Sequence, residues 1–336
     1  MFPNIFRTIQ LLPLLALSLA PGLSSAQVTP ELIEAAKKEG EVMLYGAITV
    51  NSSKAVGDAF EKKYGIKLHH WRGDATELIN RSLAEARAGK AAFDVTLGNE
   101  VVMTTLNEKN LFAVFDPPAA KAYPKQFLDP ERKMTPWRVL PYGINYNHQQ
   151  VKAEEAPRRW EDLMLPKWKG KFGLANPGIH VTTLQFVLNL DKLLGPKWLQ
   201  VVEGWVKNEP RVGRSLADNI QPLTSGEVQV AIGYIKDKFQ YKGPIEYVRM
   251  NKYLASLSFL AINRQAPHSN AARLFADFFV GPEAQRIFGN FGEYVFHPDA
   301  DHKFKKDVKD DQIVVMSLPS KEELQNWSKK FREMFR

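Results

Sequence analysis

Short apolar runs alternate with amphipathic stretches along most of this chain. The apolar runs predict strands at 41–46, 66–71 and 93–97. Apolar positions at a helical period predict helices at 30–40 and 76–88. Strands and helices that alternate at this spacing are typical of an open, mostly parallel sheet flanked by helices, so the pattern predicts the α/β class.

The alternation of predicted strands and helices is interrupted in the middle of the chain. The segment from Asp116 to Arg138 is rich in Pro, Lys and Asp, which predicts a surface connection. Extended segments follow at 139–147 and 252–262, with a renewed strand–helix pattern between them. Further helices are predicted near 196–207, 269–279, 282–288 and 320–335. Two strand–helix runs joined by extended crossings predict two lobes with a cleft between them; one large α/β domain is the alternative.

Three loops follow predicted strands, at 46–53, 98–100 and 176–183. In open α/β sheets, ligands bind beyond the carboxyl ends of the strands. The first loop contains Asn51 and Ser52, which are N-cap candidates for the next helix. We therefore expect these loops to face a ligand.

The segment 160–183 has the most informative pattern. An amphipathic turn and a basic connector lead to an apolar strand at 172–175, and a helical period begins near Thr182. Thr182 and Thr183 are N-cap candidates of that helix, and His180 precedes them. A strand, a short loop and a helix N-terminus present free backbone N–H groups to a ligand.

The first 26 residues have the pattern of a secretory signal peptide. Arg7 precedes an apolar run, Leu11 to Ala20, which is too short to span a bilayer, and Ser24-Ser25-Ala26 supplies a cleavage site. The mature chain is then expected to begin near Gln27 and to be soluble outside the inner membrane.

Composition narrows the possible functions. The absence of cysteine excludes disulfides, thiolate catalysis and cysteine-ligated metals. The formal net charge of +8 suits an anionic ligand, an acidic partner or a solubilising surface. Basic residues do not interleave with aromatic ones in runs, so a nucleic-acid partner is not expected. The spacings of common hydrolase and nucleotide-binding motifs do not occur, and we expect neither an enzyme nor a bound metal or cofactor.

Several stretches resemble the periplasmic solute-binding proteins of ABC importers, in the branch that includes ferric-ion-binding proteins. The longest are WEDLMLPKWKGKFGLANP at 160–177 and LAINRQAPHSNAARLFADFFVGPEAQ at 260–285; shorter ones are EVMLYGA, FDVTLGN, PYGINYN and SGEVQVAIG. The resemblance implies a two-lobed periplasmic binding protein fold, type II-like, with a mixed sheet in each lobe. It places 27–140 and 255–300 in the first lobe, and 141–254 and 301–336 in the second.

The resemblance also implies a function. Such a protein closes its lobes on a small-molecule solute and delivers it, as a monomer, to a permease in the inner membrane. We expect a small polar solute, with an organic anion such as a carboxylate, phosphonate or phosphate ester favoured over an amine. A ferric-ion or other metal-transport protein and a secreted hydrolase are the alternatives.

The iron-binding pattern of that branch is incomplete in this sequence. Ferric-ion members hold iron with adjacent tyrosines after the strand that corresponds to 228–233, but here Tyr234 stands alone and Lys236 and Lys238 follow it. The position of the iron-binding acid falls at Asn99, with Glu100 next to it. Lysines would repel a trivalent cation, so ferric binding is disfavoured.

Each candidate residue also has an ordinary structural explanation. Tyr45 either stacks on a ligand or forms a half-buried rim, and Lys236 and Lys238 are either ligand contacts or solvated charges. Arg211 and Arg214 either reach the cleft or lie on the surface. The predicted ligand-binding residues are Tyr45, Asn51, Ser52, Asn99, Glu100, Asn176, His180, Thr182, Thr183, Tyr234 and Lys236.

Overall fold

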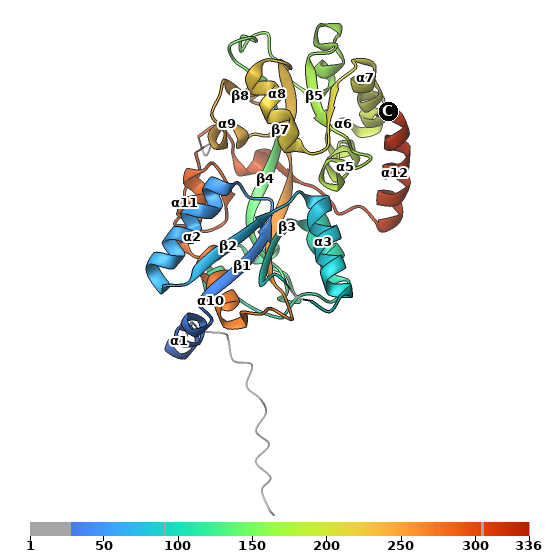
Figure 1. The fold of residues 1–336 in the computed structure, drawn as a ribbon. Helices are drawn as coiled ribbons and strands as arrows, with labels where there is room; N and C mark the ends of the chain where they lie inside the picture. The colour runs from blue at the N-terminus through green and yellow to red at the C-terminus, as the bar shows by residue number, and fades with distance from the viewer. Residues whose placement is uncertain (1–27, 91, 304–305, 336) are drawn as a thin grey trace, which may run out of the picture.

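A computed structural model describes residues 28–335 apart from residues 91, 304 and 305. The predicted signal peptide, 1–26, lies outside the described residues. The strands form one continuous mixed sheet in the order β2-β1-β3-β9-β4-β7-β5-β6. Figure 1 shows this sheet running through two lobes, with β4 and β9 passing between them. The predicted two-lobed α/β fold is confirmed.

The first lobe is built on three parallel strands. β1 (Glu41–Gly46) lies between β2 (Lys67–Arg72) and β3 (Val95–Asn99). The helices of this lobe are α1 (Pro30–Glu39), α2 (Val50–Tyr64), α3 (Ala75–Arg87), α4 (Glu100–Asn107), α10 (Ser269–Val280) and α11 (Pro282–Asn290). In this lobe, the N-cap residue of α2 differs from the prediction. Thr49, rather than Asn51 or Ser52, caps α2, because its hydroxyl accepts the Ser52 N–H.

Two long antiparallel strands join the lobes. β4 (Thr135–Asn147) and β9 (Tyr253–Ile262) are buried along their whole length. Two short strands extend this pair, since β10 (Tyr294–Val295) pairs with β4 and β11 (Ile313–Val315) pairs with β9.

The start of β4 contradicts the surface connection predicted for 116–138. Trp137 is fully buried and packs its indole against Phe279 and Phe288, and Arg138 is only 5% exposed. The polar composition of 116–133 indicated a surface segment, but β4 begins at Thr135, within the stretch 116–138 that was predicted to lie on the surface. The buried start of β4 was therefore missed.

The second lobe contains β5 (Phe172–Ala175), β6 (Arg211–Gly213), β7 (Val230–Tyr234) and β8 (Ile245–Tyr247). Its helices are α5 (Val181–Leu188), α6 (Asp191–Leu194), α7 (Trp198–Lys207), α8 (Ile220–Ser225), α9 (Asp237–Gln240) and α12 (Lys321–Met334). The N-cap residue of α5 is His180, so Thr182 and Thr183 lie within its first turn and the predicted threonine caps are wrong.

Each lobe has its own core. Two hydrophobic clusters lie in the second lobe, and the larger one includes Phe331 and Phe335 from the C-terminal end. Two other clusters cover the two faces of the first-lobe sheet. None of the helices in the described part of the chain is long and apolar enough to cross a membrane.

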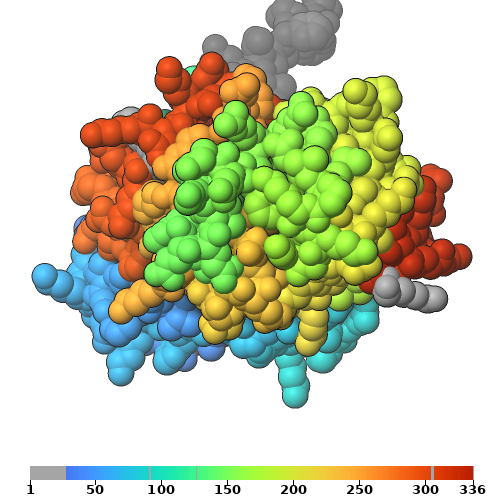
Figure 2. Space-filling view, turned by 90° about the horizontal axis from the view of Figure 1, so that it is seen from above, coloured from blue at the N-terminus to red at the C-terminus, as the bar shows by residue number. Residues whose placement is uncertain are grey.

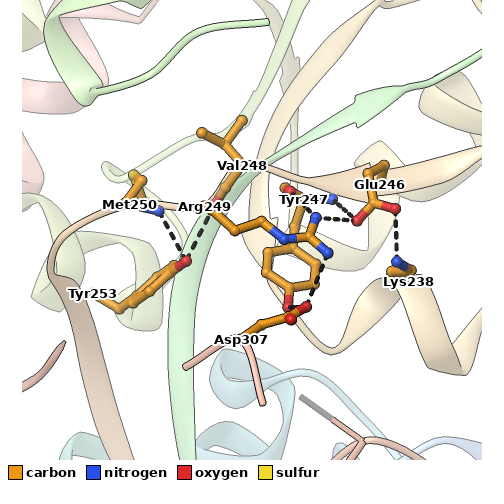
Figure 3. Close-up of polar contacts among 8 residues, drawn as sticks. All are labelled: Lys238, Glu246, Tyr247, Val248, Arg249, Met250, Tyr253 and Asp307. Carbon is orange, nitrogen blue, oxygen red and sulfur yellow. Dashed lines mark hydrogen bonds and ion pairs between the residues drawn. The ribbon is translucent and has the colours of Figure 1, made fainter. Parts of the chain in front are cut away.

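The C-terminal segment is fastened to the second lobe by polar contacts. Asp307 accepts hydrogen bonds from the Tyr247 hydroxyl at 2.8 Å and from Arg249 Nη2 at 2.9 Å (Figure 3). In Figure 2 the orange-red and dark red C-terminal residues lie at opposite edges of the green and yellow second lobe. Since β11 of the same segment pairs with β9, the assignment of 301–336 to the second lobe stays a prediction.

Candidate functional site

A cavity of about 290 Å³ lies between the lobes. The loops that follow β1, β2, β3, β5, β6 and β7 all contribute to its wall, as the position of strand ends predicts. Eight charged side chains line it, four cationic and four anionic, so their formal charges cancel. They are Arg72, Arg138, Arg214 and Lys236, and Asp74, Glu77, Asp218 and Asp237.

A buried ion network forms the inner end of the cavity, next to β4. Glu293 precedes β10, and its Oε1 accepts from Lys236 Nζ at 2.8 Å, from Gln240 Nε2 at 2.7 Å and from Arg138 Nη1. The side chains of Arg138, Lys236 and Glu293 are 6%, 8% and 1% exposed. Among the described residues, Arg138 Nε has no hydrogen-bond partner, and neither has Glu293 Oε2.

Burial sets the protonation of this network. Burial, together with the nearby charge of Arg138, lowers the pKa of Lys236 to about 8, while Glu293 and Asp237 oppose the shift. Burial alone would raise the pKa of Glu293, but Arg138 and Lys236 hold it below its ordinary value. The network therefore holds two cations on the Glu293 carboxylate when Lys236 is protonated, and the carboxylate of Asp237 lies next to Lys236 as a second anion.

Asp237 lies beside the network. Burial raises the pKa of Asp237 to about 6, against the opposing effect of Lys236. Its Oδ2 accepts the Tyr234 N–H at 2.9 Å. Gly233 leaves room for this carboxylate, since a Cβ there would lie 2.8 Å from Oδ2. The carboxylate is thus fixed by the end of β7 rather than free to turn toward a ligand.

The tyrosines near this end are held neutral. Burial raises the pKa values of Tyr234 and Tyr241 to about 12. The hydroxyl of Tyr234 lies 3.4 Å from that of Tyr142 on the neighbouring strand. A ferric site needs tyrosinate oxygens, and burial together with the nearby cations disfavours both the tyrosinate and the metal.

The outer end of the cavity is acidic. Asp74, the N-cap of α3, belongs to the first lobe, and Asp218 belongs to the second. His180 lies near both, and it is 5% exposed. Burial lowers the pKa of His180, although the charges of Asp74 and Asp218 raise it, so the ring is neutral near pH 7. The side chain of Arg214 is exposed on this part of the wall.

Asn99 connects the two lobes across the cavity. Its Oδ1 caps α4 by accepting the Val102 N–H at 3.1 Å. Its Nδ2 donates to Thr182 Oγ1 at 3.2 Å and to Gln185 Oε1 at 3.3 Å, both on α5 of the second lobe. The amide of Asn99 therefore spans the two lobes.

The structure brings together five of the predicted ligand-binding residues: Asn99, His180, Thr182, Tyr234 and Lys236 line the cavity. The other six lie outside its lining: Tyr45, Asn51, Ser52, Glu100, Asn176 and Thr183.

Three of these six have clear structural partners. Tyr45 is 1% exposed in the first-lobe core, and its hydroxyl donates to Glu85 at 2.9 Å. The Thr183 hydroxyl lies 2.7 Å from His180 Nδ1. Asn176 accepts the Gly178 N–H and so shapes the loop before α5. Lys236, one of the residues that could have been a solvated charge, is instead buried and paired.

Sequence reasoning missed Arg138, Glu293, Asp74 and Thr49. Arg138 and Glu293 are single charges within apolar stretches, WRVLPYG and FGEYVF, and that contrast was a usable signal. Asp74 and Glu77 form a capping box, another visible pattern. Of the two arginines expected either in the cleft or on the surface, Arg214 lines the cavity, whereas Arg211 pairs with Glu227 outside it.

The fold and the cavity between its lobes define a class of binding protein, and comparison with known proteins agrees. Residues 92–314 match the bacterial extracellular solute-binding protein family, and the chain belongs to that family.

Two curated relatives match parts of the chain. A probable ABC transporter periplasmic-binding protein of Sinorhizobium fredii is 28% identical over 161 residues, 48% of this chain and 42% of that protein. An Fe(3+)-binding periplasmic protein of Serratia marcescens is 25% identical over 185 residues, 54% of each chain. The matches thus span about half the length of these relatives.

Solved structures match nearly the whole fold. The periplasmic binding protein P5PA has a TM-score of 0.74 at 20% identity, covering 88% of this chain and 100% of that one. AfuA from Actinobacillus pleuropneumoniae, with fructose-6-phosphate bound, has a TM-score of 0.71 at 19% identity, with coverage of 88% and 97%. Iron-bound HitA from Pseudomonas aeruginosa has a TM-score of 0.67 at 17% identity, with coverage of 88% and 99%. At these identities the likeness concerns the fold.

Proposed function

We propose that this chain is the periplasmic solute-binding component of an ABC importer, which captures a small organic anion and delivers it to a membrane permease. The observation that carries the proposal is the buried pair of cations at the inner end of the cavity. Arg138 and Lys236 share one oxygen of Glu293, so an anion at this end would lie close to two cationic side chains.

Unused hydrogen-bond donors at this end support an anionic ligand. Arg138 Nε is buried without a partner among the described residues. A buried donor of this kind costs about 1–3 kcal/mol, and a ligand oxygen would remove that cost. The ammonium group of Lys236 has three donors and uses one of them on Glu293. An anion placed here would gain charge-assisted hydrogen bonds.

Helix N-termini add to this preference. The residues Thr49 and Asn99 cap α2 and α4, and both line the cavity. The positive ends of these helices face the same space, and they favour negative charge there. A carboxylate, a phosphonate and a phosphate ester all suit such a wall.

Closure of the lobes is the capture step in this proposal. A solute that contacts both Arg138 on β4 and Lys236 in the second lobe binds the closed form better than the open form, and so shifts the population toward closure. The bond from Asn99 to Thr182 adds to the same preference. The secreted, monomeric state and the inner-membrane permease are part of the proposal.

A ferric ion is the second candidate, because the Serratia relative is an Fe(3+)-binding protein. The neutral tyrosines and the cations beside Tyr234 weigh against it. Among the described residues, groups of three or more His, Asp or Glu side chains are not arranged to hold a metal. A hydrolase has no support from the site's charges, which are already engaged in caps and ion pairs.

The test is a thermal-shift screen of the mature protein against organic anions, amines, sugars and ferric salts, followed by calorimetry of the hits. A solute at 100 times its Kd should stabilise the fold by about 2.7 kcal/mol. Lys236→Met should weaken an anion hit at least about ten-fold. Lys238→Met is the matched control, because Lys238 pairs with Glu246 outside the cavity lining. Stabilisation by amines or iron but not by anions would refute the proposal.

A further inference from the structure

We propose, building on the function above, that the solute is dipolar: its anionic group lies at Arg138 and Lys236, and a cationic amine lies at the outer end between Asp74 and Asp218. The two ends of the cavity offer different charged groups. The inner end offers the cationic groups of Arg138 and Lys236, whereas the outer end presents carboxylates from both lobes. The exposed Arg214 lies near Asp218 in sequence and also lines the cavity. A simple anion would satisfy one end and leave the other uncompensated.

The carboxylates at the outer end belong to opposite lobes. Asp74 begins α3 in the first lobe, and Asp218 lies in the 3-10 turn Leu216–Asn219 of the second. Closure brings their negative charges to one cavity, and the charges repel each other. A cation between them turns this repulsion into attraction to both lobes, so it would favour the closed form.

The hydrogen bonds of these carboxylates leave room for such a group. Asp74 Oδ1 accepts the Glu77 N–H at 2.8 Å, while its Oδ2 has no partner among the residues that the structure describes. Asp218 Oδ2 accepts from the backbone N–H groups of Arg214 and Ser215, and its Oδ1 accepts from the Ser215 hydroxyl at 3.1 Å, so the carboxylate is oriented without an opposing formal charge. Arg214 is the nearest cation in sequence, but its exposed side chain forms no ion pair within the described chain.

The buried side chain of His180 is a second observation, independent of the two carboxylates, that indicates a ligand at this end of the cavity. The residue is nine-tenths buried and lines the cavity. Its Nδ1 lies 2.7 Å from the Thr183 hydroxyl, but Nε2 has no hydrogen-bond partner in the described residues. When Nδ1 donates its proton to Thr183, Nε2 carries a lone pair that an ammonium group can donate to.

Size and overall charge agree with a dipolar solute. The cavity, at about 290 Å³, is at the small end of ligand pockets, which suits one short molecule. The cancelling formal charges of its wall suit a ligand whose own charges cancel. A dianion without an amine would instead add repulsion from Asp74 and Asp218.

The test compares matched probes by calorimetry at pH 7: 3-aminopropylphosphonate with propylphosphonate, and 4-aminobutyrate with butyrate. In the wild type the amino compound of at least one pair should bind about ten-fold or more tightly than its partner. Asp74→Asn should reduce that ratio to near one and leave the affinity for the amine-free anion equal or higher. Asn caps a helix as well as Asp does, so the fold should be kept.

The controls separate this inference from the proposed function. Asp191→Asn, at an exposed residue outside the cavity, should leave the ratio unchanged, and Asp218→Asn should lower it as Asp74→Asn does. If the amine-free anions bind as tightly as the amino compounds, the dipolar solute is wrong and the anion-binding function stands. If none of the four probes binds, the proposed anion function fails, and this inference fails with it.

Discussion

The two ends of the cavity hold their charges in different ways. At the inner end, Arg138, Lys236 and Glu293 are almost completely buried and are joined directly by ion pairs. At the outer end, Asp74 and Asp218 are partly or fully exposed and are held by backbone N–H groups in helix-cap positions. The inner charges therefore depend on each other, whereas each outer charge depends on its own local turn.

This difference predicts that stability and ligand recognition separate along the cavity. Removing one partner of a buried ion pair leaves the other charge uncompensated, and this strongly lowers the free energy of unfolding. Removing a charge that caps a helix is cheap when the capping oxygen is kept. Substitutions at the inner end should thus affect folding as well as binding, and those at the outer end mainly binding.

The largest effect is expected for Glu293→Gln. The change leaves Arg138 and Lys236 buried without a carboxylate, and it should lower the free energy of unfolding by about 3–5 kcal/mol in urea titrations. Glu283→Gln is the matched control, since its pair with Lys63 is about half exposed and should contribute about 1 kcal/mol or less. Equal effects of the two substitutions would remove the contrast between the ends.

The pH dependence of binding sharpens the same contrast. Because the pKa of Lys236 is about 8, affinity for an anion should fall above pH 8 by up to about ten-fold per pH unit, measured by calorimetry. Lys236→Arg keeps its charge and should bind with little change over this range. An equally steep fall in Lys236→Arg would assign the titration to another group.

Stability should move in the opposite direction. The unfolded chain binds the Lys236 proton up to its ordinary pKa of 10.5, and the folded chain releases it near 8. Between these values the unfolded state holds more protons, so the contribution of Lys236 to folding becomes more favourable as the pH rises. The difference between wild type and Lys236→Met isolates this contribution.

Asn99 lies between the two ends and should have an intermediate effect. Asn99→Ala removes both the α4 cap and the donor to Thr182, and should cost about 1 kcal/mol of stability. Asn99→Asp keeps the cap and loses the donor, so its stability should stay near that of the wild type. In small-angle scattering without solute, both variants should have a larger radius of gyration. An unchanged radius in both would show that this bond does not hold the lobes together.

The smallest effect on folding is expected at the outer end. Asp74→Asn should change the free energy of unfolding by less than about 0.5 kcal/mol, because an asparagine oxygen accepts the Glu77 N–H equally well. The measurement is the urea midpoint, compared with that of Glu293→Gln. A loss as large as that of Glu293→Gln would mean that the outer charges are also structural.

The sequence was sufficient for the lobes and for much of the cavity wall. The alternation of strands and helices predicted the α/β fold, and the loops after strands contain Asn99, His180 and Thr182, which line the cavity. It was not sufficient for the helix starts, where Thr49 and His180 occupy positions assigned to neighbouring residues. Cap positions differ by only one or two residues, and packing of the helix against the sheet decides between them.

What the sequence alone determined is local: hydrophobic period, turn residues and the family resemblance fix the elements and the class of protein. Only the tertiary structure decided which charges meet. Arg138 lies 155 positions and Lys236 lies 57 positions before Glu293 in the sequence, yet both donate to the same oxygen atom of Glu293. Burial and pairing depend on the whole fold, and no local pattern encodes the pKa values that follow from them.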